Sequence, residues 1–211
     1  MNYDLYVITD QRISHGKSHL EVAEAVLAGG ATIIQFRDKE VKDSEAEAIC
    51  SKIYKLTKGK DIAFIVNDRV EVAKKVHADG VHLGQEDMSI KLARKIMNKK
   101  QIIGVSVETV DQAIKAVEEG ADYLGVGPIY PTTTKSDAGK ALGVERLKGI
   151  KAVVNIPVVA IGGINEDNLE EVLRAGADGV AVISAVVSAP DITQACRELK
   201  DKIEYINKCK A

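Results

Sequence analysis

Short apolar runs rich in β-branched residues recur eight times along the chain, and helical patterns separate most of them. The runs lie at Leu5–Thr9, Thr32–Phe36, Ile62–Val66, Gly80–Leu83, Ile102–Val105, Tyr123–Val126, Pro157–Ile161 and Gly179–Ile183. Such continuous apolar runs are typical of strands that are buried on both faces of a parallel sheet. Strands that alternate with helices along a chain therefore predict an α/β fold built on that kind of sheet.

The segments between the runs carry apolar residues at helical spacing. They span His19–Ala28, Asp43–Leu56, Val70–Val76, Ile90–Met97, Val110–Glu118, Asn168–Ala175 and Ile192–Ile206. Glycine, alanine and aspartate mark the turn from a helix into the next strand at several junctions, as in Glu119–Tyr123 and Ala175–Val180. The recurrence indicates one repeated βα unit, and no linker or shift in composition divides the chain.

Eight strand–helix units in 211 residues leave two architectures, a closed (β/α)₈ barrel and a doubly wound open sheet. The count of eight is that of the barrel. A dinucleotide-binding open sheet commonly carries a GxGxxG turn after its first strand, and none follows Leu5–Thr9. We therefore predict a single (β/α)₈ barrel domain over residues 1–211.

The balance of charges excludes some classes of partner. Lys and Arg number 29 against 31 Asp and Glu, which gives a net charge of −2 at pH 7. A chain with this charge has no electrostatic basis for nucleic acid or an anionic membrane as its main partner. The three cysteines form no CxxC pair, and the start of the chain lacks the features of a signal peptide. We therefore predict a cytoplasmic protein whose partners are small molecules.

Polar residues gather where the predicted strands end. The segments at or just after these ends are Thr9-Asp10, Gln35–Lys39, Asn67-Asp68, His82–Asp87, Ser106, Gly127–Lys135, Gly162–Ile164 and Ser184. The opposite ends carry mostly glycine, alanine and aspartate. A barrel builds its active site at the carboxyl ends of its strands, so this asymmetry predicts an enzyme. Within this set, His82 could either pack inside the barrel or contact a substrate.

The last two units carry a phosphate-binding pattern. Gly162-Gly163 follows a strand and precedes a helix, and Ile183-Ser184 closes the last strand. Loops after the seventh and eighth strands of a barrel commonly bind phosphate through backbone N–H groups, which glycine leaves accessible. The alternative is that the two glycines only shape a turn. We favour phosphate binding because Ser184 accompanies the glycine pair.

Carboxylates follow the third and fourth predicted strands, which are neighbours in a barrel. Magnesium usually takes one or two carboxylates together with phosphate oxygens of a substrate. We predict Asp68 and Asp87 as ligands of Mg²⁺, with Glu86 as an alternative to Asp87. The spacing alone also fits Asp68 and Asp87 as caps of the helices that follow them.

Two cations follow the second predicted strand. Arg37 and Lys39 would face the same way if the strand continues, and with Gln35 they can hold a diphosphate. A surface turn with local ion pairs is the other interpretation of these residues. The longest segment without periodicity, Gly127–Gly143, contains three threonines in a row and Lys135. It is either a flexible lid with donors for phosphate oxygens or a plain surface loop, and we favour the lid.

Taken together, these segments resemble thiamine phosphate synthase over nearly the whole chain. The resemblance rests on Tyr6–Asp10, Gln35–Lys39, Val66–Arg69, Gly80–Asp87, Gly104–Ser106, Gly127–Lys135 and Val159–Ile164. The Gly84–Asp87 and Pro131–Lys135 motifs are specific, whereas the glycine pair is not. The resemblance implies a barrel enzyme that joins a pyrimidine diphosphate to a thiazole phosphate and releases thiamine phosphate and diphosphate.

The resemblance also implies roles for individual residues. In that family the pyrimidine diphosphate is held by residues matching Gln35, Arg37, Lys39, Asn67 and Lys135. Residues matching Asp68 and Asp87 hold Mg²⁺, and the residue matching Ser106 contacts the pyrimidine diphosphate near its reacting end. The thiazole phosphate is held by residues matching Thr132 and Thr134 and by backbone around Gly163, Ile183 and Ser184. The predicted catalytic residues are Arg37, Lys39, Ser106 and Lys135.

The implied reaction is dissociative, because diphosphate leaves first and the thiazole nitrogen then attacks a pyrimidinylmethyl cation. Mg²⁺, Arg37 and Lys39 would stabilise the departing diphosphate more in the transition state than in the ground state. The chain departs from the family pattern at Phe36 and Asp38, where leucine and glutamate are frequent, and at Glu108, where histidine is common.

Two alternatives to a synthase use the same barrel. A tautomerase-like isomerase is one, although the related thiazole tautomerase depends on the histidine that Glu108 replaces. A non-catalytic phosphate-ligand binding protein is the other, and it would not need two metal carboxylates. The sequence leaves the oligomeric state open, and a homo-oligomer is compatible with it.

Overall fold

A computed structural model describes residues 1–134 and 139–210, without the side chain of Lys210. Eight parallel strands close into a barrel in which each strand pairs with the next and β8 pairs with β1. The strands are β1 (Leu5–Ile8), β2 (Ile33–Phe36), β3 (Ala63–Asn67), β4 (Gly80–Leu83), β5 (Ile102–Val107), β6 (Tyr123–Val126), β7 (Val158–Ile161) and β8 (Gly179–Val182). The closed order confirms the predicted (β/α)₈ barrel and rules out the open sheet.

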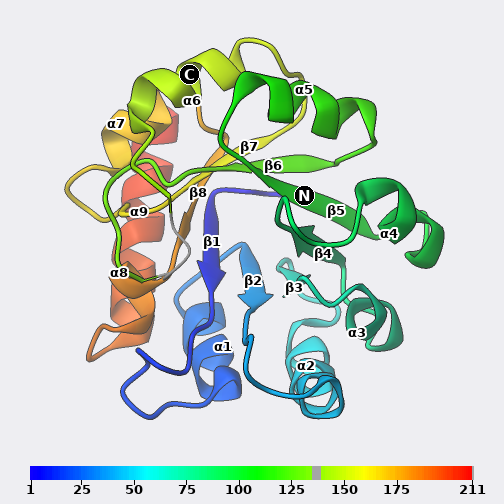
Figure 1. Ribbon diagram of the computed structural model, residues 1–211. Helices are drawn as coiled ribbons and strands as arrows, with labels where there is room; N and C mark the ends of the chain where they lie inside the picture. The colour runs from blue at the N-terminus through cyan, green and yellow to red at the C-terminus, as the bar shows by residue number, and fades with distance from the viewer. Residues whose placement is uncertain (135–138, 211) are drawn as a thin grey trace.

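Helices surround the barrel (Figure 1). They are α1 (His19–Ala28), α2 (Asp43–Thr57), α3 (Val70–Lys75), α4 (Ile90–Ile96), α5 (Val110–Glu118), α6 (Gly143–Lys151), α7 (Leu169–Arg174), α8 (Ser184–Val187) and α9 (Ile192–Lys210). The predicted helical segments correspond to all of these except α6 and α8. None of the described helices has the length and apolar character needed to cross a membrane.

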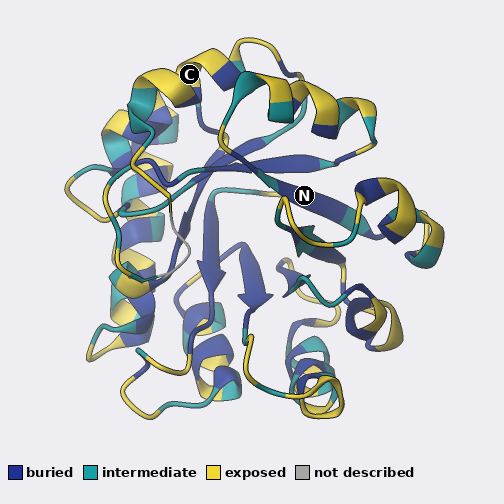
Figure 2. Ribbon diagram, in the orientation of Figure 1, coloured by how far each residue is buried: buried dark blue, intermediate teal, exposed yellow. Residues whose placement is uncertain are grey.

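The buried residues form two layers, one inside the barrel and one between the strands and the helices (Figure 2). The inner layer consists of Tyr6, Ile8, Ile33, Ala63, Ile65, Tyr123, Val159, Ala181 and Ile183. The outer layer packs the other face of each strand against the apolar faces of the helices. Because both faces of the strands are covered, their sequences read as continuous apolar runs.

Two glycines leave room for large rings inside the barrel. A Cβ atom on Gly104 would lie 2.0 Å from Cζ of Tyr123, and one on Gly125 would lie 3.0 Å from Cε1 of His82. No side chain fits at the first position, and the second is already tight. The sequence therefore fills the barrel with Tyr123 from β6 and His82 from β4 by leaving the facing positions without side chains.

Strand pairing places several polar site residues near the carboxyl ends of neighbouring strands. Asn67 on β3 pairs with His82 on β4, and Ser106 on β5 pairs with Gly125 on β6. These positions are at or near the carboxyl ends of their strands. The barrel therefore presents polar side chains from several strands at the end where its loops can enclose a ligand.

Candidate active site

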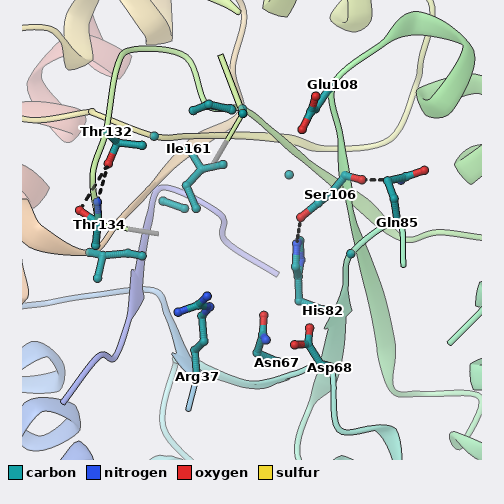
Figure 3. Close-up of a pocket in the computed structure, with 18 of the residues that line it drawn as sticks. Arg37, Asn67, Asp68, His82, Gln85, Ser106, Glu108, Thr132, Thr134 and Ile161 are labelled. Carbon is teal, nitrogen blue, oxygen red and sulfur yellow. Dashed lines mark hydrogen bonds between the residues drawn. The ribbon is translucent and has the colours of Figure 1, made fainter. Parts of the chain in front are cut away.

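A cavity of about 470 Å³ lies at the carboxyl ends of the strands. Most of the predicted site residues line it, namely Arg37, Lys39, Asn67, Asp68, Asp87, Ser106, Thr132, Thr134, Ile183 and Ser184. Gln35 and Gly163 are not among the lining residues, and Lys135 lies outside the described part of the chain. Figure 3 shows labelled side chains from several strands converging on this space.

Arg37 is buried and held by a carboxylate that follows the neighbouring strand β1. Its Nη1 atom lies 3.8 Å from Oδ2 of Asp10, which is itself buried. Asp10 also accepts hydrogen bonds from the backbone N–H, Nε and Nη2 of Arg12 at 2.8–3.1 Å. Burial would raise the pKa of Asp10, but the hydrogen bonds and charge of Arg12, with a contribution from Arg37, lower it below its ordinary value. Asp10 is therefore ionised, and its carboxylate helps to orient the Arg37 side chain.

The turn that carries Lys39 is fixed through a buried histidine. His19 on α1 bridges Oγ1 of Thr9 at 2.7 Å and Oδ2 of Asp38 at 3.1 Å. Asp38 in turn accepts the backbone N–H groups of Glu40 and Val41 through its Oδ1. The segment after β2 is thus not a free surface turn, because its aspartate is tied to the barrel and to α1.

Asp68 and Asp87 meet at the edge of the cavity, and neither caps a helix. The N-cap residues of α3 and α4 are Arg69 and Ser89, and neither helix start has a side-chain capping bond. Asp87 instead accepts the backbone N–H of Gly84 at 2.6 Å. The alternative of two helix caps is therefore wrong for this chain.

The two carboxyl groups repel each other when both are ionised. Asp68 has a left-handed backbone with φ of 60°, a conformation that aspartate tolerates better than most residues. Burial, a side-chain hydrogen bond with Asp87 and the Asp87 charge together raise the pKa of Asp68 to about 6, against the opposing charges of Lys39 and Arg37. A cation between the two carboxyl groups would relieve this repulsion.

The donor set suits a metal that keeps several outside ligands. Within the described residues, no group of three or more His, Cys, Asp or Glu side chains is arranged to hold a metal ion. A metal held by Asp68 and Asp87 would thus draw its remaining ligands from a substrate or from water. Mg²⁺ is the ion that usually binds in this way.

Hydroxyl groups line another side of the cavity. Thr134 donates from Oγ1 to Oγ of Ser184 at 3.3 Å, and its backbone N–H donates to Oγ1 of Thr132 at 3.3 Å. These bonds join the loop after β6 to the start of α8. The two loops together present three hydroxyl groups, and such groups commonly donate hydrogen bonds to phosphate oxygens.

The glycine pair after β7 has a clear structural role. Gly162 and Gly163 have φ values of 101° and 65°, and a Cβ on Gly162 would lie 2.5 Å from Cα of Pro128. The loop after β6 packs directly on this turn, with the Tyr130 N–H donating to the Gly162 carbonyl at 3.0 Å. The glycines thus shape the turn, as the alternative interpretation proposed, and Gly162 also lines the cavity.

Gln35 lies inside the barrel and is only 1% exposed. Its Nε2 donates to the hydroxyl of Tyr6 at 2.6 Å. Its Oε1 is the buried side-chain polar atom that lacks a hydrogen-bond partner among the described residues. An unpaired buried acceptor is uncommon and costly in a folded protein.

Three further residues line the cavity without having been predicted as site residues. His82 bonds Oγ of Ser106 at 2.9 Å and packs on the ring of Tyr123, which confirms packing inside the barrel, and it also lines the cavity, where contact with a substrate stays a prediction. Gln85 donates to the backbone carbonyl of Ser106 at 2.6 Å, and Glu108 lines the cavity beyond Ser106 (Figure 3). The sequence offered signals for both, because Gln85 is part of the Gly84–Asp87 motif and Glu108 follows the fifth strand at a position where the family commonly has histidine.

The chain is similar to proteins of known activity over almost its whole length. Residues 5–186 match the family described as thiamine monophosphate synthase. A thiamine-phosphate synthase of Chloroflexus aurantiacus is 49% identical over 200 residues, covering 95% of this chain and 92% of that protein. One from Methanospirillum hungatei is 51% identical over 201 residues, covering 95% and 98% respectively. A solved thiamine phosphate pyrophosphorylase from Pyrococcus furiosus has a TM-score of 0.89 and 47% identity, with 96% of each chain covered.

Proposed function

The chain belongs to the thiamine monophosphate synthase family, and we propose that it transfers a pyrimidinylmethyl group from its diphosphate to a thiazole phosphate. The products are thiamine phosphate and diphosphate. Family membership makes the chain a transferase of thiamine biosynthesis that acts on small molecules. The group transferred, the bond formed and the metal are proposals that rest on the resemblance to this family, with the residues of the cavity as support, and a cytoplasmic location stays a prediction.

The observation that carries this function is the division of the cavity into two polar sides. Arg37, Asn67 and Asp68 gather on one side, and Thr132 and Thr134 lie on another, while the apolar side chain of Ile161 lines the same cavity near the two threonines (Figure 3). A reaction between two phosphorylated molecules needs two sets of side chains that bind phosphate oxygens. It also needs a less polar space between them where the reacting carbon and nitrogen can meet without water.

The first side of the cavity would bind the pyrimidine diphosphate. As the carbon–oxygen bond breaks, its electron pair leaves with the diphosphate, which gathers negative charge. Arg37 is already oriented by Asp10, so its guanidinium can stabilise this charge without reorganisation, and Lys39 adds a second cation.

Asp68 and Asp87 would hold Mg²⁺. The raised pKa of Asp68 beside Asp87 supports this assignment, because it marks two carboxyl groups that repel each other when both are ionised. When bound, the ion would neutralise part of the diphosphate charge. The role of the two aspartates is to hold that charge on the same side of the cavity as Arg37 and Lys39.

The hydroxyl side would hold the thiazole phosphate. Thr132, Thr134 and Ser184 are linked to one another and can turn their hydroxyl groups toward phosphate oxygens. Fixing the phosphate would aim the thiazole nitrogen at the pyrimidine methylene carbon, where the new carbon–nitrogen bond forms. Because the incoming nitrogen supplies the electron pair, no protein nucleophile is needed.

A direct assay of product formation tests this function. Purified protein is incubated with both substrates, with Mg²⁺ or with chelator, and thiamine phosphate is quantified by chromatography. We expect product only with metal, and a loss of at least about 100-fold in Asp87→Ala, because a lost ligand and its charge remove transition-state stabilisation. Asp61→Ala is the matched control, since Asp61 is exposed at the opposite end of β3.

Two outcomes would contradict the assignment. Full activity in chelator would show that the reaction does not require Mg²⁺, and it would rule out the proposed roles of Asp68 and Asp87 as ligands of the ion. Tight binding of both substrates with no product would instead favour the non-catalytic binding protein or the isomerase.

A further inference from the structure

A chain of hydrogen bonds crosses the interior of the barrel and ends at the cavity. Gln35 on β2 donates to the Tyr6 hydroxyl on β1 at 2.6 Å, and the Tyr6 and Tyr123 hydroxyls lie 2.9 Å apart. The Tyr123 hydroxyl lies 2.9 Å from Nδ1 of His82, and Nε2 of His82 lies 2.9 Å from Oγ of Ser106. Five strands thus contribute one side chain each to a continuous polar path.

The surroundings of this chain hold its members in place. Tyr123 and Tyr6 are 0% and 2% exposed, so their hydroxyl groups have no access to solvent. Gly104 and Gly125 provide the space that the Tyr123 and His82 rings occupy. Burial also raises the pKa of both tyrosines well above the ordinary value, so each keeps its proton. Each tyrosine can therefore donate one hydrogen bond and no more.

The donor-to-acceptor direction of these hydrogen bonds follows from Gln35, the first residue of the series. The side-chain NH₂ group of Gln35 can only donate, so the Tyr6 oxygen accepts from it and the Tyr6 proton turns to Tyr123. Tyr123 then donates its own proton to Nδ1 of His82. A neutral imidazole that accepts at Nδ1 carries its proton on Nε2, and that proton points at Ser106.

The opposite amide orientation would reverse the whole path. It would place the carbonyl of Gln35 on Tyr6 and leave the NH₂ group, with two donors, buried without an acceptor. The observed orientation leaves only the carbonyl oxygen unpaired. Unpaired buried carbonyls are more common in proteins than unpaired N–H donors, so the observed orientation is the favoured one.

We propose that Gln35, Tyr6 and Tyr123 are positioning residues that hold His82 as the Nε2–H tautomer, so that Ser106 turns its hydroxyl proton into the cavity. Ser106 accepts from His82, and its own proton is then free to donate to an acceptor of the substrate. This inference rests on the proposed function for the identity of that acceptor, an oxygen or ring nitrogen of the pyrimidine diphosphate. A donor in this place would help the diphosphate to leave.

The tautomer can be measured without any substrate. In protein labelled with ¹⁵N-histidine, the protonated and bare ring nitrogens give widely separated signals, and His82→Gln identifies those of His82 among the four histidines. We expect Nδ1 bare and Nε2 protonated in the parent protein. Tyr123→Phe keeps the ring but removes the donor to Nδ1, so the share of the Nε2–H tautomer should fall.

Two other tyrosine variants complete the series. Tyr6→Phe leaves the Tyr123 hydroxyl but removes the hydroxyl group that directs it. We therefore expect the share of the Nε2–H tautomer of His82 to fall, but by less than in Tyr123→Phe. Tyr3→Phe is the matched control, because the Tyr3 ring packs 5.3 Å from that of Tyr123 but its hydroxyl is not part of the chain. If Tyr123→Phe does not fold, Tyr6→Phe against Tyr3→Phe decides the question.

Activity provides a second and separate readout. In Tyr123→Phe we expect kcat to fall about tenfold with little change in KM, as for the loss of one ordering hydrogen bond. A bare Nε2 in the parent protein, or an unchanged tautomer in both Tyr123→Phe and Tyr6→Phe, would overturn the inference. Absence of product in the parent protein would contradict the proposed function, whereas the histidine signals would still decide the direction of the chain.

Discussion

Asp68 combines two unfavourable features in one residue. Its backbone is left-handed, and its carboxyl group is partly buried beside that of Asp87. Such strain persists only where the surrounding structure holds the residue in place, and it concentrates at functional sites. The backbone N–H of Asp68 donates to the carbonyl of His82 at 2.9 Å, which ties the turn to the neighbouring strand. The cost of this arrangement makes sense if a cation occupies the space between the carboxyl groups.

The raised pKa of Asp68 predicts a pH dependence of stability in chelator. The folded protein holds the Asp68 proton up to about pH 6, whereas the unfolded chain releases it near 3.8. The folded state therefore binds more protons in this window, and stability should fall as pH rises through it. Thermal unfolding at constant ionic strength checks this against Asp68→Asn, which should lack that part of the decline. Parallel curves for the two proteins would contradict the raised pKa.

The pairing of Asp10 with Arg37 predicts that a substitution at Asp10, which does not itself line the cavity, lowers the activity of the enzyme. Asp10→Asn keeps the size of the side chain but leaves Arg37 buried beside a neutral group. We expect kcat/KM for the pyrimidine diphosphate to fall by about tenfold and stability to fall by about 2 kcal/mol. Arg12→Ala is the control, because it keeps the Asp10 charge next to Arg37. An equal loss of activity in both variants would show that Arg12 and not the Arg37 pair is important.

The contacts that the sequence did not predict are those that cross the barrel. Gln35 was expected to bind a diphosphate, yet it is buried inside the barrel and reaches Tyr6 on another strand. Tyr123 is 117 residues from Tyr6 along the chain, and only strand order and tilt bring their hydroxyls together. Residues that follow strand ends, such as Asp68 and Thr134, were predictable because the fold places all strand ends at one face.

At the level of elements, the sequence predicted what is periodic and missed what is short or irregular. The eight strands were predicted because burial on both faces leaves a continuous apolar run. Helix α8 has four residues, too few for helical spacing to appear. Helix α6 follows a long irregular segment, begins at Gly143 and has no side-chain capping bond at its start. Apart from Glu145 in its first turn, its amino end therefore carries few of the usual sequence signals.

Two glycine substitutions test how the inner layer is packed. Gly104→Ala would place a Cβ 2.0 Å from the Tyr123 ring, and we expect a loss of about 3 kcal/mol in the free energy of unfolding. Gly149→Ala is the matched control, because Gly149 is exposed in α6 and its Cβ would meet nothing within 4 Å. It should stabilise the protein by about 0.5 kcal/mol through helix propensity. Urea unfolding measures both, and equal effects would contradict the packing of Tyr123 against Gly104.

On the scale of the whole molecule, the barrel joins its first and last elements. Strand β1 pairs with both β2 and β8, and Lys200 of α9 bonds Asp4 just before β1 at 2.7 Å. The cavity is lined by segments that follow nearly every strand, so a ligand there contacts elements from the whole length of the chain. Binding should therefore stabilise the entire barrel and not one local region.

This arrangement predicts that a metal ion and a phosphate anion together raise the stability of the protein. Mg²⁺ with inorganic diphosphate should raise the Tm, and at 100 times the Kd the gain in stability is about 2.7 kcal/mol. Asp87→Ala should lose most of this shift, whereas Asp61→Ala should retain it. A shift of equal size with diphosphate alone would show that the anion binds without the metal.

The most direct test of the proposed reaction follows phosphorus in a single sample. With Mg²⁺ and both substrates, ³¹P NMR should show the pyrimidine diphosphate signals replaced by free diphosphate, with one thiamine phosphate formed for each diphosphate released. Free diphosphate without thiamine phosphate would mean that the cavity hydrolyses its ligand. Unchanged signals from both substrates would contradict the transfer itself.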